Sequence, residues 1–141
     1  MNSDQLEIQN LIHSFFHCID DYHYNPDDFV NKFQSLFAKD AQFEFPYRNV
    51  SVQNHEDNLK NLCTKMATNF KGFNHVEYNV VIELNGNLAT NQSYWAAYDK
   101  GQMTSLGRHY DEFVKEDGKW LFKYRLVRLR YSLQDGNVID K

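Results

Sequence analysis

The spacing of apolar residues in the first half of the chain predicts helices. From residue 4 to residue 20, apolar side chains recur at every third or fourth position, the period of an amphipathic helix. Asp4 followed by Glu7 resembles a capping box at the start of this helix. A second helix is predicted to begin at Pro26 with Asn25 as its N-cap, and a third to run from about residue 54 to residue 71.

The second half of the chain reads as extended segments. Four long strands are predicted at residues 75–84, 88–98, 107–116 and 119–131, after a short strand at 41–45. Asn85-Gly86 and Asp117-Gly118 fall between paired strands and favour hairpins, because glycine adopts the positive φ of such turns at no steric cost. The element order predicts one α+β domain over residues 1–141, in which helices pack across a curved antiparallel sheet and enclose one pocket. Its core spans about residues 5–131, and residues 132–141 form a tail.

Composition narrows the class of protein. Aromatic residues make up 16% of the chain, and such residues line small-molecule sites as well as cores. A net charge of −4 argues against a nucleic-acid partner held through phosphates. Cys18 and Cys63 lie in helical patterns without metal-like spacing, which predicts buried free thiols in a reducing compartment. No signal peptide or membrane span is visible, so a soluble cytoplasmic protein without a membrane partner is expected.

Short segments with a recognisable order and spacing run along most of the chain. They are Ile19-Asp20, residues 36–43, His75 with Asn79, residues 83–86 with 89–90, 107–108 with 110–112, 118–120 and 125–130. Together they resemble the SnoaL-like group of the nuclear transport factor 2-like superfamily over about residues 5–131. The resemblance implies a cone-shaped fold, in which a strongly bent antiparallel sheet wraps around about three N-terminal helices. Relatives include polyketide cyclases, scytalone dehydratase, ketosteroid isomerases and members without chemistry, so the fold is better specified than the activity.

Asp20 and His75 are the first candidates for chemistry. In dehydratase-like and cyclase-like relatives an aspartate near the end of the first helix orients a pocket histidine, and the resemblance implies that these two residues match. Proton removal next to a carbonyl, or loss of water, needs a base whose pKa lies near the working pH, and imidazole supplies one. Asp20 lies one helical turn after Phe16, on the shoulder of the apolar stripe. Without the resemblance, an aspartate at a helix end is usually a surface group or a cap.

Strand alternation argues against an inward His75. It places Val76, Tyr78, Val80, Ile82 and Leu84 on one face, and His75, Glu77, Asn79 and Glu83 on the opposite, solvent-facing side. A β-bulge, which is common in strongly bent sheets, would exchange the two faces partway along the strand and turn His75 inward. The orientation of His75 therefore depends on a bulge that the sequence does not reveal.

His109 is the second candidate, in a strand where it shares a face with Asp111 and Phe113. It is expected either to donate a hydrogen bond to a substrate oxygen or to be a strand histidine satisfied by a neighbour. Relative to scytalone dehydratase, His109 stands where a pocket amide is expected, and Phe45 stands where a catalytic tyrosine is expected. Both departures weaken the prediction of a scytalone-type dehydration.

Candidate ligand contacts are polar or aromatic strand residues: Asn79, Tyr94, Tyr98, Phe43, Phe45 and Trp95. Alternation sends Tyr94 and Tyr98 to one face and Trp95 to the other, so these three cannot all line one pocket. An aromatic stripe at strand spacing is more often core than site.

Two further clusters are assigned no ligand. His13 and His17 have helical i, i+4 spacing and in principle hold a metal with Asp21 or His23, but they lie opposite the apolar stripe, so no metal is expected. The basic residues of the last long strand are expected to pair with acidic groups or to border a subunit contact; they are Lys123, Arg125, Arg128 and Arg130.

The sequence therefore predicts a cofactor-independent enzyme that isomerises, cyclises or dehydrates a small, apolar, oxygenated compound. His75 would be the general acid/base, Asp20 its orienting partner, and His109 or a tyrosine would polarise a carbonyl. A homodimer formed through the sheet face is expected. The alternatives are a non-catalytic module that binds a hydrophobic ligand or a protein, and a vestigial pocket filled by side chains.

Overall fold

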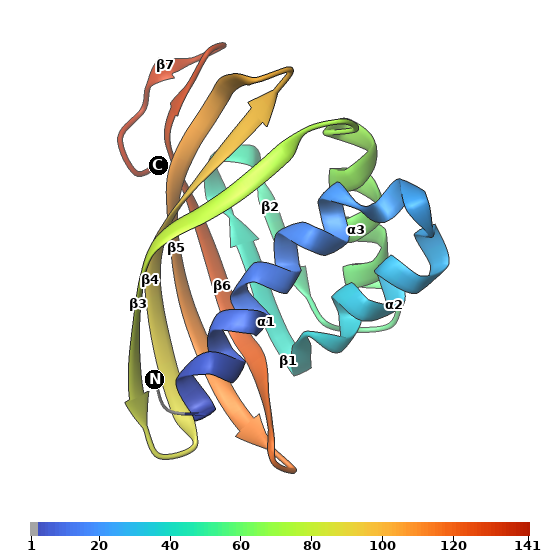
Figure 1. The fold of residues 1–141 in the computed structure, drawn as a ribbon, viewed down its shortest axis with the longest axis vertical. Helices are drawn as coiled ribbons and strands as arrows, with labels where there is room; N and C mark the ends of the chain where they lie inside the picture. Colours follow the sequence, from blue (N-terminus) through green and yellow to red (C-terminus); the bar gives the residue numbers. More distant parts are fainter. Residues whose placement is uncertain (1–2) are drawn as a thin grey trace.

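Three helices pack into the concave side of a seven-stranded sheet in the computed structural model, which describes residues 3–141 (Figure 1). The helices are α1 (Ser3–Asp20), α2 (Pro26–Ser35) and α3 (Asn58–Asn69), with short 3-10 turns η1 (Tyr22–Tyr24) and η2 (Pro46–Arg48). The strands are β1 (Phe37–Phe45), β2 (Val50–Gln53), β3 (Asn74–Asn85), β4 (Leu88–Asp99), β5 (Gln102–Glu116), β6 (Lys119–Ser132) and β7 (Gly136–Asn137). The predicted α+β cone is confirmed. None of the helices within residues 3–141 has the length and apolar character needed to cross a membrane.

The sheet is mixed rather than purely antiparallel. Its strands follow the order β2-β1-β6-β5-β4-β3, with β7 also paired to β6. Hairpins make β3 to β6 an antiparallel meander, whereas β1 lies parallel to β6. The prediction of an entirely antiparallel sheet is wrong at this pair, because β1 and β6 are far apart in sequence and no tight turn dictates their relative direction.

Helix α1 lies diagonally across the concave face and supplies much of the core (Figure 1). The predicted apolar stripe is buried, with Ile8, Leu11, Ile12, Phe15, Phe16, Cys18 and Ile19 turned inward. Asp4 and Glu7 do not form the predicted capping box. Their carboxylates instead accept hydrogen bonds from Trp120, at 3.0 Å from Nε1 and 2.8 Å from the backbone nitrogen, and tie α1 to β6.

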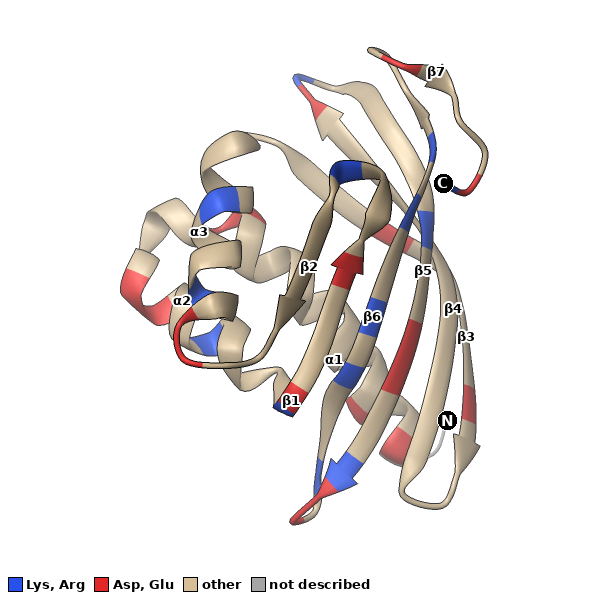
Figure 2. Ribbon diagram, turned by 180° about the vertical axis from the view of Figure 1, so that it is seen from behind, with Lys and Arg blue, Asp and Glu red and all other residues tan. Residues whose placement is uncertain are grey.

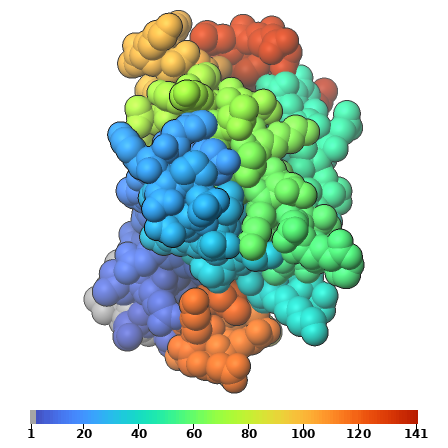
Figure 3. Space-filling model, turned by 90° about the vertical axis from the view of Figure 1, so that its right-hand side faces the viewer, coloured from blue at the N-terminus to red at the C-terminus, as the bar shows by residue number. Residues whose placement is uncertain are grey.

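Tight turns set the length of the long strands. Asp117 and Gly118 both have positive φ, 52° and 76°, as a type I′ hairpin requires. In the β3–β4 hairpin the central residues are Gly86 and Asn87, one position later than predicted. A turn at Lys100 and Gly101 was not predicted, and it lets β5 begin at Gln102 rather than at residue 107. The hairpin tips near residues 100 and 117 lie at opposite ends of the molecule (Figure 3).

The C-terminal tail folds back along β6. Leu129 and Lys141 exchange backbone hydrogen bonds of 2.8 and 3.0 Å, and Arg130 donates to the carboxylate of Asp140. The tail thereby covers backbone groups of β6 beyond its pairing with β1.

Gly107 lies where β5 and β6 approach closely beside Trp95. A Cβ at this position would overlap the backbone oxygen of Arg128 and stand 2.8 Å from the Trp95 ring. Gly107→Ala is therefore expected to destabilise the protein by about 3 kcal/mol through overpacking, as measured by urea unfolding. Gly72→Ala is the control, because its Cβ meets nothing within 4 Å and only backbone strain remains. Equal losses in the two variants would contradict this account of Gly107.

Strands β5 and β6 carry both signs of charge, with Lys and Arg along β6 and Asp and Glu on β5 (Figure 2). Arg108 and Arg128 are neighbours across the β5–β6 pair, and Glu112 lies further along β5. A two-fold axis that passed between these positions would bring the arginines of one copy to the glutamate of the other. The homodimer stays a prediction: Arg108→Glu is expected to dissociate it in sedimentation experiments, and Lys65→Glu on α3 is not. A wild-type monomer would contradict it.

Candidate active site

An apolar cavity lies between the concave face of the sheet and helices α1 and α3, with a volume of about 90 Å³. Most of its walls are apolar, and its residues are Phe15, Phe16, Ile19, Phe43, Phe45, Arg48, Met66, Phe70, His75, Trp95, Ala97, Ser105, His109, Val127 and Leu129. Arg48 and Phe70 are exposed and mark the rim that opens to solvent. The space left open argues against a pocket entirely filled by side chains.

His75 lines this cavity and is in direct contact with Asp20, which is not itself among the cavity residues. His75 Nδ1 lies 2.6 Å from Asp20 Oδ1, and the His75 backbone nitrogen donates to Asp20 Oδ2 at 2.8 Å. One carboxylate accepts two hydrogen bonds from His75, one from the ring and one from the backbone, and so fixes the orientation of the imidazole. The His75 side chain is 7% exposed, and its ring stacks on Phe16 at 4.6 Å. Nδ1 therefore carries the proton that Asp20 accepts, which leaves Nε2 as the reactive nitrogen of the neutral ring.

A bulge in β3 turns His75 inward. The pairing with β4 shifts between Tyr78 and Val81, and Asn79 has a positive φ of 53°. On the N-terminal side of the bulge His75 and Glu77 face inward, whereas Val76 and Tyr78 are exposed on the outside. The faces assigned by strict alternation are thus wrong for this half of the strand, because the extra residue reverses the order beyond it.

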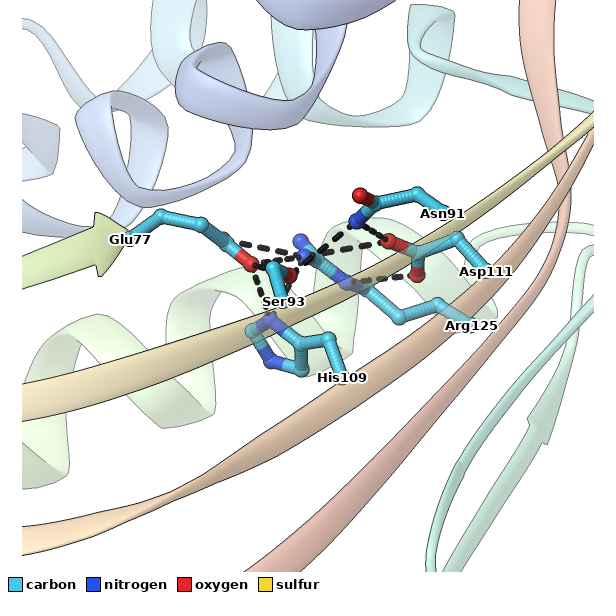
Figure 4. Close-up of polar contacts among 6 residues, drawn as sticks. All are labelled: Glu77, Asn91, Ser93, His109, Asp111 and Arg125. Atoms are coloured by element: carbon cyan, nitrogen blue, oxygen red, sulfur yellow. Dashed lines mark hydrogen bonds and ion pairs between the residues drawn. The ribbon is translucent and has the colours of Figure 1, made fainter. Parts of the chain in front are cut away.

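A buried polar cluster lies behind the cavity, with one or two residues from each of strands β3 to β6 (Figure 4). Its members are Glu77, Asn91, Ser93, His109, Asp111 and Arg125. Glu77 accepts hydrogen bonds from Ser93 Oγ at 2.7 Å and from Arg125 Nη2 at 2.8 and 2.9 Å. Asp111 Oδ1 lies 3.0 Å from Arg125 Nε, so Arg125 is shared by two carboxylates.

His109 joins this cluster to the cavity. Its Nδ1 lies 2.5 Å from Glu77 Oε2, and its ring forms part of the cavity wall between Phe16 and Trp95. Burial and the nearby Arg125 lower the pKa of His109 to about 4, so the ring is neutral at pH 7. The Glu77 pKa is lowered to about 2: burial opposes ionisation, but Arg125 and His109 outweigh it.

Three of the six ligand candidates line the cavity and three do not. Phe43, Phe45 and Trp95 line the cavity. Asn79 is exposed in the bulge, and Tyr94 lies over Arg108 on the outer face, 5.4 Å from its guanidinium carbon. Tyr98, 36% exposed, is not among the cavity residues either. Neither tyrosine is therefore available to polarise a bound carbonyl.

The cluster residues Glu77, Asn91, Ser93 and Arg125 were missed as parts of a site. A signal was present: Asn91, Ser93, Asp111 and Arg125 each occupy an inward strand position among apolar neighbours, and a buried polar residue needs partners. Glu77 carried no such signal, because only the bulge brings it inward.

The histidines of α1 and the two cysteines form no evident binding site within residues 3–141. His17 pairs with Asp21 at 3.5 Å on the exposed side of α1. Within residues 3–141, no group of three or more His, Cys, Asp and Glu side chains is arranged to hold a metal ion. Cys18 and Cys63 are buried free thiols, as predicted, and burial raises their pKa values to about 11 and 12.

His109 and Asp111, two groups of the buried cluster, make the stability of the fold depend on pH in opposite directions. Below about pH 6.5 the unfolded chain protonates His109 while the native ring stays neutral, so its contribution to stability falls as the pH drops from 6.5 to about 4. Burial raises the pKa of Asp111 from 3.8 to about 7, so its contribution falls as the pH rises through that range.

These trends oppose each other between pH 4 and pH 6.5. Asp111→Asn removes one of them, so the unfolding free energy of this variant is expected to fall on acidification across that window more steeply than in the wild type. Urea unfolding at several pH values measures the slopes, with exposed Asp27→Asn as the control. A wild-type slope in Asp111→Asn would contradict the assignment.

The bent sheet with helices in its concave side is the cystatin-like fold of solved structures, one of which is a nuclear transport factor 2-like protein. Residues 2–126 match the SnoaL-like domain family, and the chain belongs to this family. No curated protein sequence matches it.

Solved structures share the fold at low sequence identity. A protein of unknown function from Nostoc punctiforme has a TM-score of 0.78 at 22% identity, with 92% of each chain covered. A candidate scytalone dehydratase from Novosphingobium aromaticivorans has a TM-score of 0.75 at 22% identity, covering 98% of this chain and 91% of that one. A hexachlorocyclohexane dehydrochlorinase of LinA type 3 from Novosphingobium barchaimii has a TM-score of 0.76 at 14% identity, covering 99% and 96%. At these identities the likeness shows the fold alone.

Proposed function

We propose that the protein is a cofactor-independent enzyme that transfers protons on a small, mostly apolar, oxygenated compound. The observation that carries this proposal is the contact of Asp20 with His75 at the wall of an apolar cavity. An imidazole whose Nδ1 is bound to a carboxylate has one free nitrogen in a fixed direction, which general acid/base catalysis requires.

In the proposed reaction, His75 Nε2 removes a proton from a carbon next to a carbonyl. The imidazolium that forms stays hydrogen-bonded to Asp20, and the substrate becomes an enolate. Ser105 and Arg48 line the cavity and can donate a hydrogen bond to the enolate oxygen, in place of the predicted tyrosines. Trp95 also lines it, and its Nε1–H has no hydrogen-bond partner within residues 3–141. Return of the proton from His75 to another carbon gives isomerisation. Transfer of the same proton to a β-hydroxyl group, which then leaves as water, gives dehydration.

The neighbours favour elimination among these outcomes, since dehydratase and dehydrochlorinase are both names of eliminating enzymes.

The cavity limits the size of the substrate. Its volume of about 90 Å³ is below the ~150 Å³ of an engineered cavity that holds benzene, so it encloses the reacting carbons of a small ring while the rest extends past the rim.

A non-catalytic binding site is the second candidate function. The aromatic and aliphatic walls are sufficient to hold an apolar ligand without any proton transfer. In that case His75 would be a hydrogen-bonding partner of the ligand only.

Exchange of carbon-bound hydrogen in D₂O separates the two candidates. Small ring ketones such as cyclopentanone are expected to lose their α-hydrogens faster with the protein than in buffer, as followed by NMR. Ligand binding is followed independently through the fluorescence of Trp95 in the cavity wall. Ketones that bind but exchange only at the buffer rate would support the binding role and contradict the enzyme.

A further inference from the structure

The second imidazole of the cavity is held differently from the first. His109 is 3% exposed and touches both a carboxylate and a guanidinium through the same nitrogen. Nδ1 lies 2.5 Å from Glu77 Oε2 and 2.6 Å from Arg125 Nη2. Nε2 points away from the polar cluster (Figure 4), and no residue within 3–141 is hydrogen-bonded to it.

The two contacts of His109 Nδ1 imply different positions for the ring proton. Glu77 can only accept a hydrogen from Nδ1, whereas Arg125 can only donate one to it. An approach of 2.5 Å between a nitrogen and a carboxylate oxygen requires a hydrogen between them, since otherwise two lone pairs would face each other. Arg125 already directs Nη2 at both oxygens of Glu77, at 2.8 and 2.9 Å, and only donates. The proton therefore belongs on Nδ1, and Arg125 is a close neighbour of the ring rather than its donor.

We infer that Glu77 is a positioning residue that keeps the His109 proton on Nδ1, so that the bare Nε2 faces the cavity and accepts a hydrogen bond from a hydroxyl group of the ligand. Ser93 and Arg125 fix the Glu77 carboxylate for this role. The inference rests on the proposed function for the site and narrows its substrate class to hydroxylated compounds. It also reverses the expectation that His109 donates to a substrate oxygen.

The two histidines consequently have unequal roles. His75 has only a carboxylate beside its Nδ1, so a positive charge on its ring is balanced by Asp20. His109 has Arg125 at 2.6 Å, and a second positive charge there is disfavoured. A ligand with a hydroxyl group on one side and an acidic C–H bond on the other fits between the two histidines. His109 accepts the hydrogen bond of the hydroxyl group, and His75 takes up the proton of the C–H bond.

The test is the tautomer of His109, read from long-range ¹H–¹⁵N NMR spectra of the wild-type protein, with the signals assigned by their loss in His109→Phe. The expected result is a protonated Nδ1 and a bare Nε2 at pH 7. Addition of cyclopentanol is expected to shift the Nε2 signal, and the matched cyclopentanone, which cannot donate, is expected to leave it unchanged. A proton on Nε2, or no response to cyclopentanol, would overturn the inference.

Glu77→Gln is expected to move the His109 proton at least partly to Nε2, because a glutamine can present its amide N–H₂ to Nδ1. Glu83→Gln, an exposed change on the same strand, is the control and should leave the tautomer unchanged. If Glu77→Gln does not fold, the wild-type spectra still decide. None of these measurements needs turnover, so a failed exchange assay with a correct tautomer would leave a binding site for hydroxylated ligands and reject only the enzyme.

Discussion

Arg125→Met is expected to lower the free energy of unfolding by about 3–5 kcal/mol, the usual cost of removing one partner from a buried ion pair. Arg125 has no exposed side-chain surface, and it is shared by Glu77 and Asp111, which are also buried. Methionine keeps much of the contact with the rings of Phe15 and Phe122, on which the guanidinium packs at 4.5 and 5.0 Å. The loss therefore comes mainly from the carboxylates left without a cation.

The loss should be larger at pH 8 than at pH 5. Without Arg125, His109 can take up a proton beside Glu77, because the guanidinium is one of the causes that hold its pKa low. Urea unfolding at the two pH values measures the difference. Arg128→Met, a half-buried arginine on the outer face of the same strand, is the matched control and should cost far less. Similar small losses in both variants would show that the cluster does not depend on Arg125.

Asp20→Asn is expected to slow proton exchange on a bound ketone by about 10²–10⁴-fold, the usual contribution of a positioned acid/base group. The side chain keeps its shape, but an amide can donate to His75 Nδ1 and so place the ring proton on Nε2, where the base is needed. The result would be a folded protein with the wrong tautomer.

Asp21→Asn provides a matched control for this variant. Asp21 is the next residue in the chain and pairs with exposed His17, whereas Asp20 pairs with His75. The exchange rate of Asp21→Asn is expected to equal that of the wild type. Equal loss in both variants, or in neither, would remove Asp20 from the mechanism.

Most helices, strands and turns could be predicted from the sequence, because short runs of neighbouring residues determine them. The apolar stripe of α1 and the Asp117-Gly118 turn are recognisable from a few neighbouring residues, and the structure has both. The parallel contact of β1 with β6 and the position of the tail were not predictable, because both depend on residues distant in sequence.

Prediction of the site from the sequence depended on one local irregularity, the β-bulge in β3. The bulge at Asn79 decides that His75 and Glu77 face inward, and it places an asparagine at positive φ, a conformation in which asparagine is several-fold enriched but not obligatory. Asp20 and His75 were brought together by the resemblance, whereas simple alternation turned His75 to solvent. Glu77 was unrecognisable as a partner of His109, because their contact joins strands that are not neighbours in the sheet.

The most direct test of the account uses 3-hydroxycyclopentanone, which carries a carbonyl, acidic C–H bonds and a β-hydroxyl group. Incubation with the protein in D₂O, followed by NMR, reports α-hydrogen exchange and loss of water to cyclopentenone in one experiment. Exchange is expected to saturate with substrate concentration and to be lost in Asp20→Asn but not in Asp21→Asn. A compound that binds, seen as shifts of the His75 and His109 signals, yet reacts only at the buffer rate would contradict it.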